Sequence, residues 1–200
     1  MRKIPFDMDN PVDNLFIYFS DKLCPYFRVT NHSPNIITTY SFLLGLLSVY
    51  YLFFDNVFMF SFLYLLSYFF DCVDGHYARK YGMVTSFGDK YDHFTDVFVA
   101  VILSYVVYSK FYDYISFGVI ICLYFSVFMM LIHLGHQQQY YHDINCGVYD
   151  SGDDGDEFLD NFRVLCVNKN DIYFTRYFGT GSFMVFTICL VFYLHVVSRV

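Results

Sequence analysis

Residues 71–96 read DCVDGHYARKYGMVTSFGDKYDHFTD, with apolar sequence on both sides. The spacing D-x2-D-G-x2-A-R-x8-G-x3-D-x3-D contains four aspartates: Asp71, Asp74, Asp92 and Asp96. A carboxylate at the centre of a bilayer costs about 2.5–3.5 kcal/mol on insertion scales. Four of them at the ends of hydrophobic helices therefore imply a counter-charge, most simply a bound divalent metal.

The spacing places the motif on two helix faces. At about 100° per residue, the first half puts two acids and two small residues on one stripe, with an arginine at its edge: Asp71, Asp74, Gly75, Ala78 and Arg79. The second half stacks Gly88, Asp92 and Asp96 at i, i+4 and i+8. Because the small residues remove side-chain bulk, a ligand can approach the backbone closely. We therefore expect two acidic stripes that face each other across a pocket.

The composition predicts a membrane protein. Of 200 residues, 56% are hydrophobic and only 16% are charged, which is too apolar for a soluble domain of this length. We expect a single all-α domain over 1–200, a bundle of transmembrane helices. Apolar runs long enough to span occur at 36–54, 57–70 (continuing helically to about 79), 87–108, 114–134 and 177–197. A weaker segment near 161–173 leaves five or six spans open.

The N-terminal segment, residues 1–33, differs from these spans. Residues 12–27 mix Leu15, Phe16 and Phe19 with Asp21 and Lys22, a pattern typical of an amphipathic helix that lies in the membrane interface. An amphipathic connector that packs on the bundle is the alternative interpretation.

The distribution of charge predicts the orientation. If the N-terminus, the loop between the second and third spans and the loop between the fourth and fifth spans lie on one side of the membrane, that side carries ten basic residues. Only Lys110 and Arg199 then lie on the other side. Basic loops favour the cytosol, so we expect the 71–96 motif at the cytosolic face. The net charge of −7 equals the charge of the seven acids between residues 143 and 160, in the segment 140–172 that we interpret as a solvated cytosolic loop. No basic face suited to nucleic acid is present, so we expect no nucleic-acid partner.

The eight fixed residues of the motif match the signature of the CDP-alcohol phosphotransferases without a gap or substitution, so the chain resembles this family of integral-membrane enzymes. Members commonly have six spans. Shorter matches, NPVDN at 10–14, PN at 34–35 with Thr38, and TRYFG at 175–179, are similar to the choline/ethanolamine phosphotransferase branch. The pair Asp92-His93 also occurs in that branch.

The resemblance implies roles for single residues. Asp71, Asp74 and Asp92 would bind Mg²⁺ or Mn²⁺, as two ions that clamp a diphosphate. Asp96 would accept the proton of the acceptor alcohol and could also reach the second ion. The substrate-binding residues would be Asn35, Gly75, Ala78, Arg79 and Gly88, with Arg79 supplying a fork for phosphate. The partners would be a CDP-alcohol, a lipid or alcohol acceptor, membrane lipids and a second copy in a homodimer.

Several functions stay open from the sequence alone. The leading one transfers a substituted phosphate from CDP-choline or CDP-ethanolamine to diacylglycerol, with release of CMP. The second uses CDP-diacylglycerol and a small polar alcohol such as inositol, glycerol phosphate or serine. A divalent-cation carrier and an inactive membrane scaffold are alternatives of other classes. A salt-bridged helix pair is the structural alternative, but five aspartates between residues 71 and 96 face only Arg79, Lys80 and Lys90.

Overall fold

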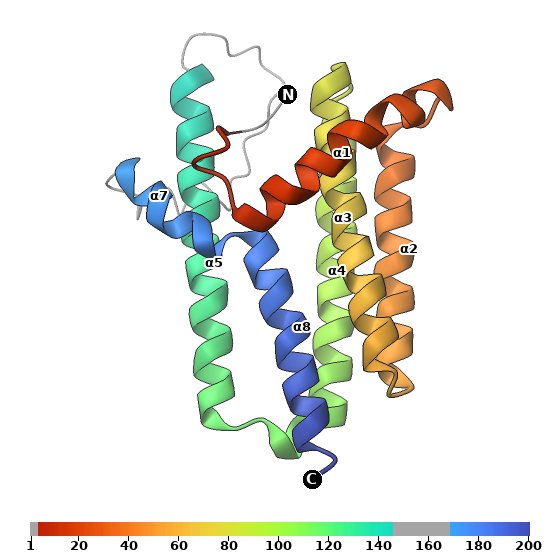
Figure 1. Ribbon diagram of the computed structural model, residues 1–200, viewed down its shortest axis with the longest axis vertical. Coiled ribbons are helices and arrows are strands. Elements are labelled where there is room, and N and C mark those ends of the chain that lie inside the picture. The colour runs from red at the N-terminus through yellow and green to blue at the C-terminus, as the bar shows by residue number, and fades with distance from the viewer. Residues whose placement is uncertain (1–3, 146–168) are drawn as a thin grey trace. The chain divides into compact units, whose positions relative to one another are not determined.

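The computed structural model describes residues 4–145 and 169–200 of the chain (Figure 1). These residues form helices and connecting turns, without a strand among them. Five helices are long and apolar enough to cross a membrane: α2 (Pro34–Phe53), α3 (Val57–Tyr81), α4 (Ser86–Phe111), α5 (Phe117–Asn145) and α8 (Thr180–Val197). The shorter elements are α1 (Pro11–Val29), η1 (Tyr112–Tyr114), η2 (Lys169–Asp171), α7 (Ile172–Thr175) and η3 (Arg176–Phe178). The prediction of an all-α membrane protein is therefore confirmed.

Each predicted span corresponds to one of these helices, and the ends differ by residue-specific causes. α2 begins at Pro34, because proline fits the first helical turn, where its missing N–H is not needed. α3 continues to Tyr81 and ends at Gly82, whose φ of 64° is the left-handed conformation that glycine adopts readily. α5 begins only at Phe117, after the 3-10 turn η1, and runs well past residue 134. Of the weaker segment 161–173, residues 161–168 lie outside the described residues.

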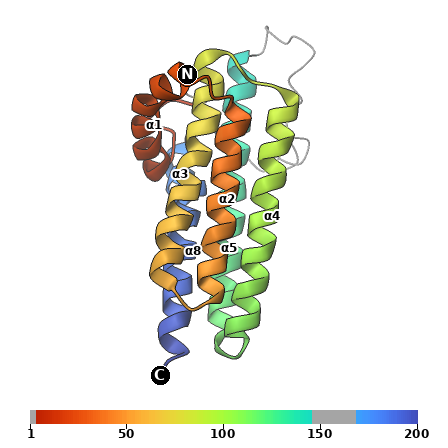
Figure 2. The same cartoon turned by 90° about the vertical axis from the view of Figure 1, so that its right-hand side faces the viewer.

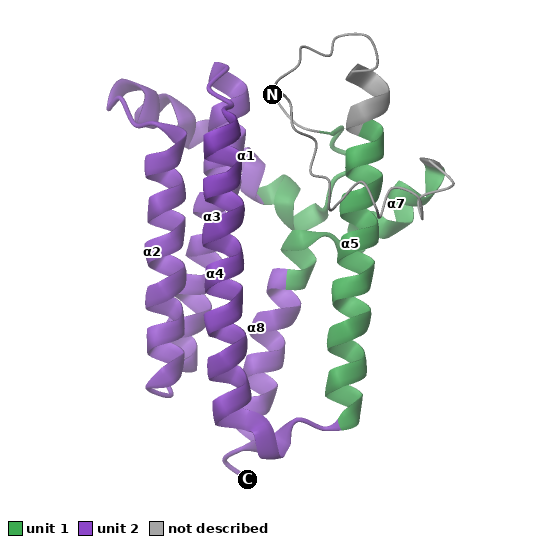
Figure 3. Cartoon of the chain, turned by 180° about the vertical axis from the view of Figure 1, so that it is seen from behind, with its two compact units in different colours: residues 1–15, 117–183 green, residues 16–116, 184–200 purple. Residues whose placement is uncertain are grey.

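The chain divides into two compact units (Figure 3). Unit 1 contains Met1–Leu15 and Phe117–Phe183, and unit 2 contains Phe16–Ser116 and Met184–Val200. The 71–96 motif and the helices around it lie wholly in unit 2. The interpretation of 1–200 as a single domain stays a prediction.

In unit 2, α2 lies between α3 and α4 and packs against both (Figure 2). Two reciprocal hydrogen bonds join α2 to α3, because Ser41 Oγ donates to Ser67 O and Ser67 Oγ donates to Ser41 O, each at 2.8 Å. At Gly45, a Cβ atom would lie 3.0 Å from Val99 of α4 and 3.1 Å from Ser67 Oγ. Small residues on α2 thus permit the close approach of both neighbours.

The segment of α1 that belongs to unit 2 packs against the C-terminal half of α3. Cys24 is fully buried in a cluster with Val73 and Tyr77 of α3, and Phe27 packs against the same cluster. Tyr18, Phe19 and Tyr26 of α1 are exposed. α1 is therefore a connector packed on α3 that also presents an aromatic face, and its position in a membrane interface stays a prediction.

In unit 1, three segments distant in sequence meet at a buried polar junction. The fully buried Asn10 donates from Nδ2 to Arg176 O (2.6 Å) and Ser182 Oγ (2.8 Å), and its Oδ1 accepts from Val12 N (2.9 Å). His133 of α5 is also fully buried, and its Nδ1 lies 3.3 Å from Thr175 Oγ1. The NPVDN and TRYFG segments singled out in the sequence therefore contact one another.

Candidate metal and nucleotide site

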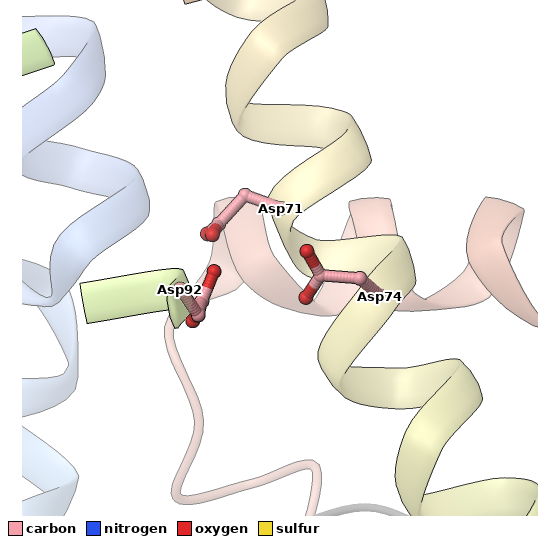
Figure 4. Close-up of side chains that lie close together, drawn as sticks. All are labelled: Asp71, Asp74 and Asp92. Atoms are coloured by element: carbon pink, nitrogen blue, oxygen red, sulfur yellow. The ribbon is translucent and has the colours of Figure 1, made fainter. Parts of the chain in front are cut away.

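Three of the four motif aspartates converge between α3 and α4 (Figure 4). Asp71 and Asp74 are three residues apart on α3, so they share a helix face, and Asp92 projects from α4 toward them. One carboxylate oxygen from each residue lies within 4.8 Å of the others. Asp74 is the most enclosed, with 4% of its surface exposed. Three of the four aspartates on the two predicted acidic stripes therefore lie close together in the structure.

The chemistry of this cluster suits a hard divalent cation. Asp74 Oδ2 and Asp92 Oδ1 are buried and have no hydrogen-bond partner, although a buried polar oxygen normally has one. The carboxyl groups of Asp71 and Asp92 lie within hydrogen-bonding reach of each other, which brings like charges together. Arg79 interacts electrostatically with Asp92, but one guanidinium cannot neutralise three carboxylates. Oxygen-rich sets of this kind are the ligands that Mg²⁺ and Mn²⁺ prefer.

The polar first turns of α2 line the same space. The side chain of Thr38 hydrogen-bonds that of Asp74, and Thr38 is itself buried. One residue further along, Thr39 Oγ1 lies 3.0 Å from the hydroxyl of Tyr91 on α4. Because α2 lies between α3 and α4, these two threonines tie α2 to both helices that carry aspartates.

Asn35 and Gly88, both predicted to bind substrate, lie against each other. A Cβ atom at position 88 would stand 2.9 Å from Asn35 Oδ1, closer than real Cβ contacts. The Gly88 amide donates to Thr85 Oγ1 at 3.0 Å, which caps the N-terminus of α4. A glycine here therefore lets the α4 N-terminus approach the Asn35 amide group.

Gly75 and Arg79 form a second pair of predicted residues that the structure brings together. Both terminal nitrogens of the Arg79 guanidinium lie 3.3 Å from the position of a Cβ atom on Gly75. The guanidinium therefore folds back over the glycine. Ala78 lies on the last turn of α3, where its carbonyl oxygen accepts from Met83 N at 2.8 Å.

Asp96 lies outside the group of three close carboxylates. It stands one turn after Asp92 on α4 and is exposed, yet it is near enough to interact electrostatically with Asp71. His93 is exposed as well, and its Nδ1 lies 3.3 Å from Asp89 O. The role of Asp96 as a base, and its reach toward a second ion, stay predictions.

The sequence interpretation did not select several residues that contact this site. Thr39 and Tyr91 could have been suspected, since they are polar residues close to the motif or to the PN pair. Tyr64 of α3 interacts electrostatically with Asp96 and Asp71, and its spacing of seven residues from Asp71 places it on the same helix face. Asp21 had no signal of its own, because its contact with α3 depends on how α1 crosses that helix.

The sequence model of the CDP-alcohol phosphatidyltransferase family matches residues 31–197, which include every residue of the motif. Members of this family transfer a substituted phosphate from a CDP-alcohol to an acceptor in phospholipid synthesis, and they use divalent cations. No curated protein and no solved structure matches the chain. The family match covers most of the chain and agrees with the three aspartates that meet between α3 and α4. The chain therefore belongs to the CDP-alcohol phosphatidyltransferase family.

Proposed function

We propose that this enzyme transfers phosphocholine or phosphoethanolamine from the CDP-alcohol to diacylglycerol and releases CMP. The observation that supports it most is the convergence of Asp71, Asp74 and Asp92 beside the Arg79 guanidinium. Carboxylates that hold divalent cations next to a planar cation are what binding of a diphosphate ester requires.

Each motif residue has a part in this reaction. Asp71, Asp74 and Asp92 would hold Mg²⁺ or Mn²⁺, which would supply the positive charge that neutralises the diphosphate. Arg79 binds a phosphate oxygen, and Gly75, which has no side chain, leaves room for the Arg79 guanidinium that lies over it. Asn35 and Gly88 contact the nucleotide from α2 and α4, and Ala78 lines the wall of α3.

Asp96 acts on the acceptor. Its carboxylate takes the proton from the diacylglycerol hydroxyl as the hydroxyl oxygen attacks the phosphorus of the substituted phosphate. The bond from that phosphorus to the oxygen of CMP breaks, so the charge released on CMP matches the negative charge lost from Asp96. Because Asp96 is exposed and stands one turn beyond the cluster, an acceptor that enters from the bilayer can reach it.

The choice of donor rests on the Asp92-His93 pair and on the N-terminal NPVDN segment. The second candidate is CDP-diacylglycerol with a small polar alcohol. Labelled donors distinguish the two, because only one class of donor carries the diacylglycerol group.

The cytosolic position of the site is part of the proposal. In unit 2, Lys22, Arg28, Lys80 and Lys90 accompany the motif, whereas Lys110 and Arg199 lie near Asp55, at the opposite ends of α2 and α4. A cysteine that replaces the exposed Lys90 should react with an impermeant maleimide only from the cytosolic side of oriented vesicles. Reaction from the outer side alone would reverse the orientation. Chemical cross-linking in the same vesicles tests the homodimer.

The experiment that tests the function uses the full chain in lipid nanodiscs with labelled CDP-choline, CDP-ethanolamine or CDP-diacylglycerol. We expect CMP release from the first two when diacylglycerol and Mg²⁺ or Mn²⁺ are present, and none with a chelator. Release from CDP-diacylglycerol with a polar alcohol would select the second candidate. No release from any donor would contradict a transferase, and Mn²⁺ uptake into sealed vesicles would then indicate a carrier.

A further inference from the structure

One carboxylate of α1 contacts two residues of the α3 turn that follows the aspartate cluster. Asp21 Oδ1 accepts from Lys80 Nζ at 2.6 Å and from His76 Nε2 at 3.1 Å. Lys80 Nζ also lies 3.3 Å from the backbone oxygen of Asp21. His76 and Lys80 are four residues apart, so they lie on one face of α3, and His76 is 4% exposed.

This contact lies beside the part of the motif that is proposed to bind the nucleotide. His76 directly follows Gly75, and Lys80 directly follows Arg79, so the two held residues bracket the turn that carries the guanidinium. The turn is also the last of α3, because the helix ends at Gly82. A terminal turn lacks half of its backbone hydrogen bonds and frays unless other contacts hold it.

Other residues of α1 and of the turn after it also contact the last turns of α3. Phe27 packs against the buried cluster that contains Tyr77, and the Tyr77 hydroxyl donates to His32 O at 2.9 Å. α1 and the residues after it therefore follow α3 along its last two turns, on a different side from the aspartates.

We propose that Asp21 is a positioning residue for the nucleotide site, which sets the rotation of the last turn of α3 and with it the direction of Arg79. This inference rests on the proposed function and adds a residue outside the matched family region, which begins at residue 31. Asp21 does not touch substrate, and it acts through His76 and Lys80.

The expected effect of removing Asp21 follows from the exposure of the Asp21–Lys80 ion pair. Asp21 has 58% of its side chain exposed, and ion pairs of that kind contribute little to folding stability. A small displacement of a phosphate-binding group, in contrast, can weaken substrate binding strongly. Loss of Asp21 should therefore affect nucleotide binding far more than folding.

Unit 2 contains a matched control at the other ends of its helices. Asp55 accepts from Lys110 Nζ at 2.7 Å, and its side chain is 59% exposed. The two aspartate–lysine pairs thus have the same charged groups, similar N···O distances and similar exposure of the aspartate side chain. Only the Asp21–Lys80 pair adjoins the motif. Asp55→Asn removes an equivalent ion pair without affecting the last turn of α3.

The test compares the full-length wild type, Asp21→Asn, Asp21→Glu and Asp55→Asn in nanodiscs with CDP-choline, diacylglycerol and Mn²⁺. For Asp21→Asn we expect KM for CDP-choline to rise about tenfold, with kcat within about twofold of wild type. Asp21→Glu should recover part of this loss, and Asp55→Asn should leave KM unchanged. A KM of Asp21→Asn within about twofold of both wild type and Asp55→Asn would overturn the proposal.

Amide hydrogen exchange gives a readout that needs no turnover. Amides of residues 77–81 should exchange faster in Asp21→Asn than in wild type, and Asp55→Asn should match wild type there. If wild type released no CMP from any donor, the proposed function would fail, and exchange would still decide the inference. Equal exchange at 77–81 in all four proteins would overturn it.

Discussion

Asp96 has the same side chain as the three aspartates before it in the motif, but its surroundings differ. Asp74 is almost fully enclosed and shares a small space with Asp71 and Asp92. Asp96 lies outside that group and is exposed. A metal ligand must lie close to the other ligands, whereas a base must reach an acceptor that arrives from outside. The difference in position therefore supports a division of roles among four identical side chains.

Substitutions that keep size and remove charge test this division. Asp74→Asn should weaken Mn²⁺ binding and CDP-choline binding together, because the diphosphate is held through the ions. Asp96→Asn should keep most of the CDP-choline affinity but lose rate by about 10²–10⁴-fold, since an amide cannot take the acceptor proton. Equilibrium binding and turnover on the same samples measure both effects. Near wild-type turnover of Asp96→Asn would assign the base to another group, with Asp92 or His93 next.

The contact between Gly88 and Asn35 makes a second prediction at this scale. Gly88→Ala places a Cβ atom 2.9 Å from Asn35 Oδ1, so the Asn35 side chain must move. We expect KM for the CDP-alcohol to rise by roughly tenfold, because the proposed nucleotide contact is displaced. Asn35→Ala should raise KM similarly, and the double variant should be little worse than either single one. Additive losses would show that the two residues act independently.

Among the elements, α2 has a central position that its sequence only partly reveals. Its length, its proline at the start and its apolar character predict a span, and the structure has one at Pro34–Phe53. The polar residues of its first turns, Thr38 and Thr39, face the aspartate cluster only because α2 lies between α3 and α4. Helix periodicity gives the face on which a residue lies, but not which helix packs against that face.

The packing of α1 on α3 has a consequence for stability at acid pH. The Lys80 ammonium, with His76, holds the pKa of the Asp21 carboxyl below the usual value of 3.8. A carboxyl with a depressed pKa in the folded state contributes stability above its unfolded pKa and loses it as pH falls through the folded value. The difference in unfolding temperature between wild type and Asp21→Asn should thus be larger at pH 7 than at pH values below about 3.8. A difference that grows with acid would contradict this assignment.

The motif spacing predicted the site better than it predicted the surroundings. The proximity of Asp71, Asp74 and Asp92 and the five apolar spans follow from helical periodicity and apolar runs, and the structure has them. Ends such as the start of α5 at Phe117 were displaced by a short 3-10 turn that hydropathy does not detect. The contact of Asp21 with His76 joins residues 55 apart in sequence, so no local pattern predicts it.

At the scale of the whole molecule, residues that precede the family match also form part of the fold. The family match begins at residue 31, yet Asn10 is fully buried in unit 1 against Arg176 and Ser182. Gly179 and Gly181 permit this, because a Cβ atom at position 179 would lie 2.8 Å from the His133 ring and 3.0 Å from Asn10. Unit 1 therefore includes residues that precede the family match as well as residues within it.

Asn10→Ala tests the contribution of this junction. The change removes three hydrogen bonds and leaves buried partners unsatisfied, so we expect a loss of about 2–4 kcal/mol in the free energy of unfolding. Asn56→Ala is the matched control, because Asn56 caps α3 through one exposed bond to Met59 N, and its loss should cost about 0.5–1.5 kcal/mol. Reversible unfolding in detergent measures both. Equal losses would mean that the junction adds nothing beyond a helix cap.

In the proposed mechanism, three carboxylates from α3 and α4 bind the divalent cation that the transfer needs. Electron paramagnetic resonance of Mn²⁺ titrated into the full chain in nanodiscs tests it most directly, with wild type, Asp74→Asn and Asp89→Asn compared. Asp89 is an exposed aspartate in the first turn of α4, outside the cluster, and serves as the control. We expect wild type and Asp89→Asn to bind Mn²⁺ equally and Asp74→Asn to bind it at least about tenfold more weakly. Equal binding by Asp74→Asn and wild type would contradict a metal site at these three aspartates.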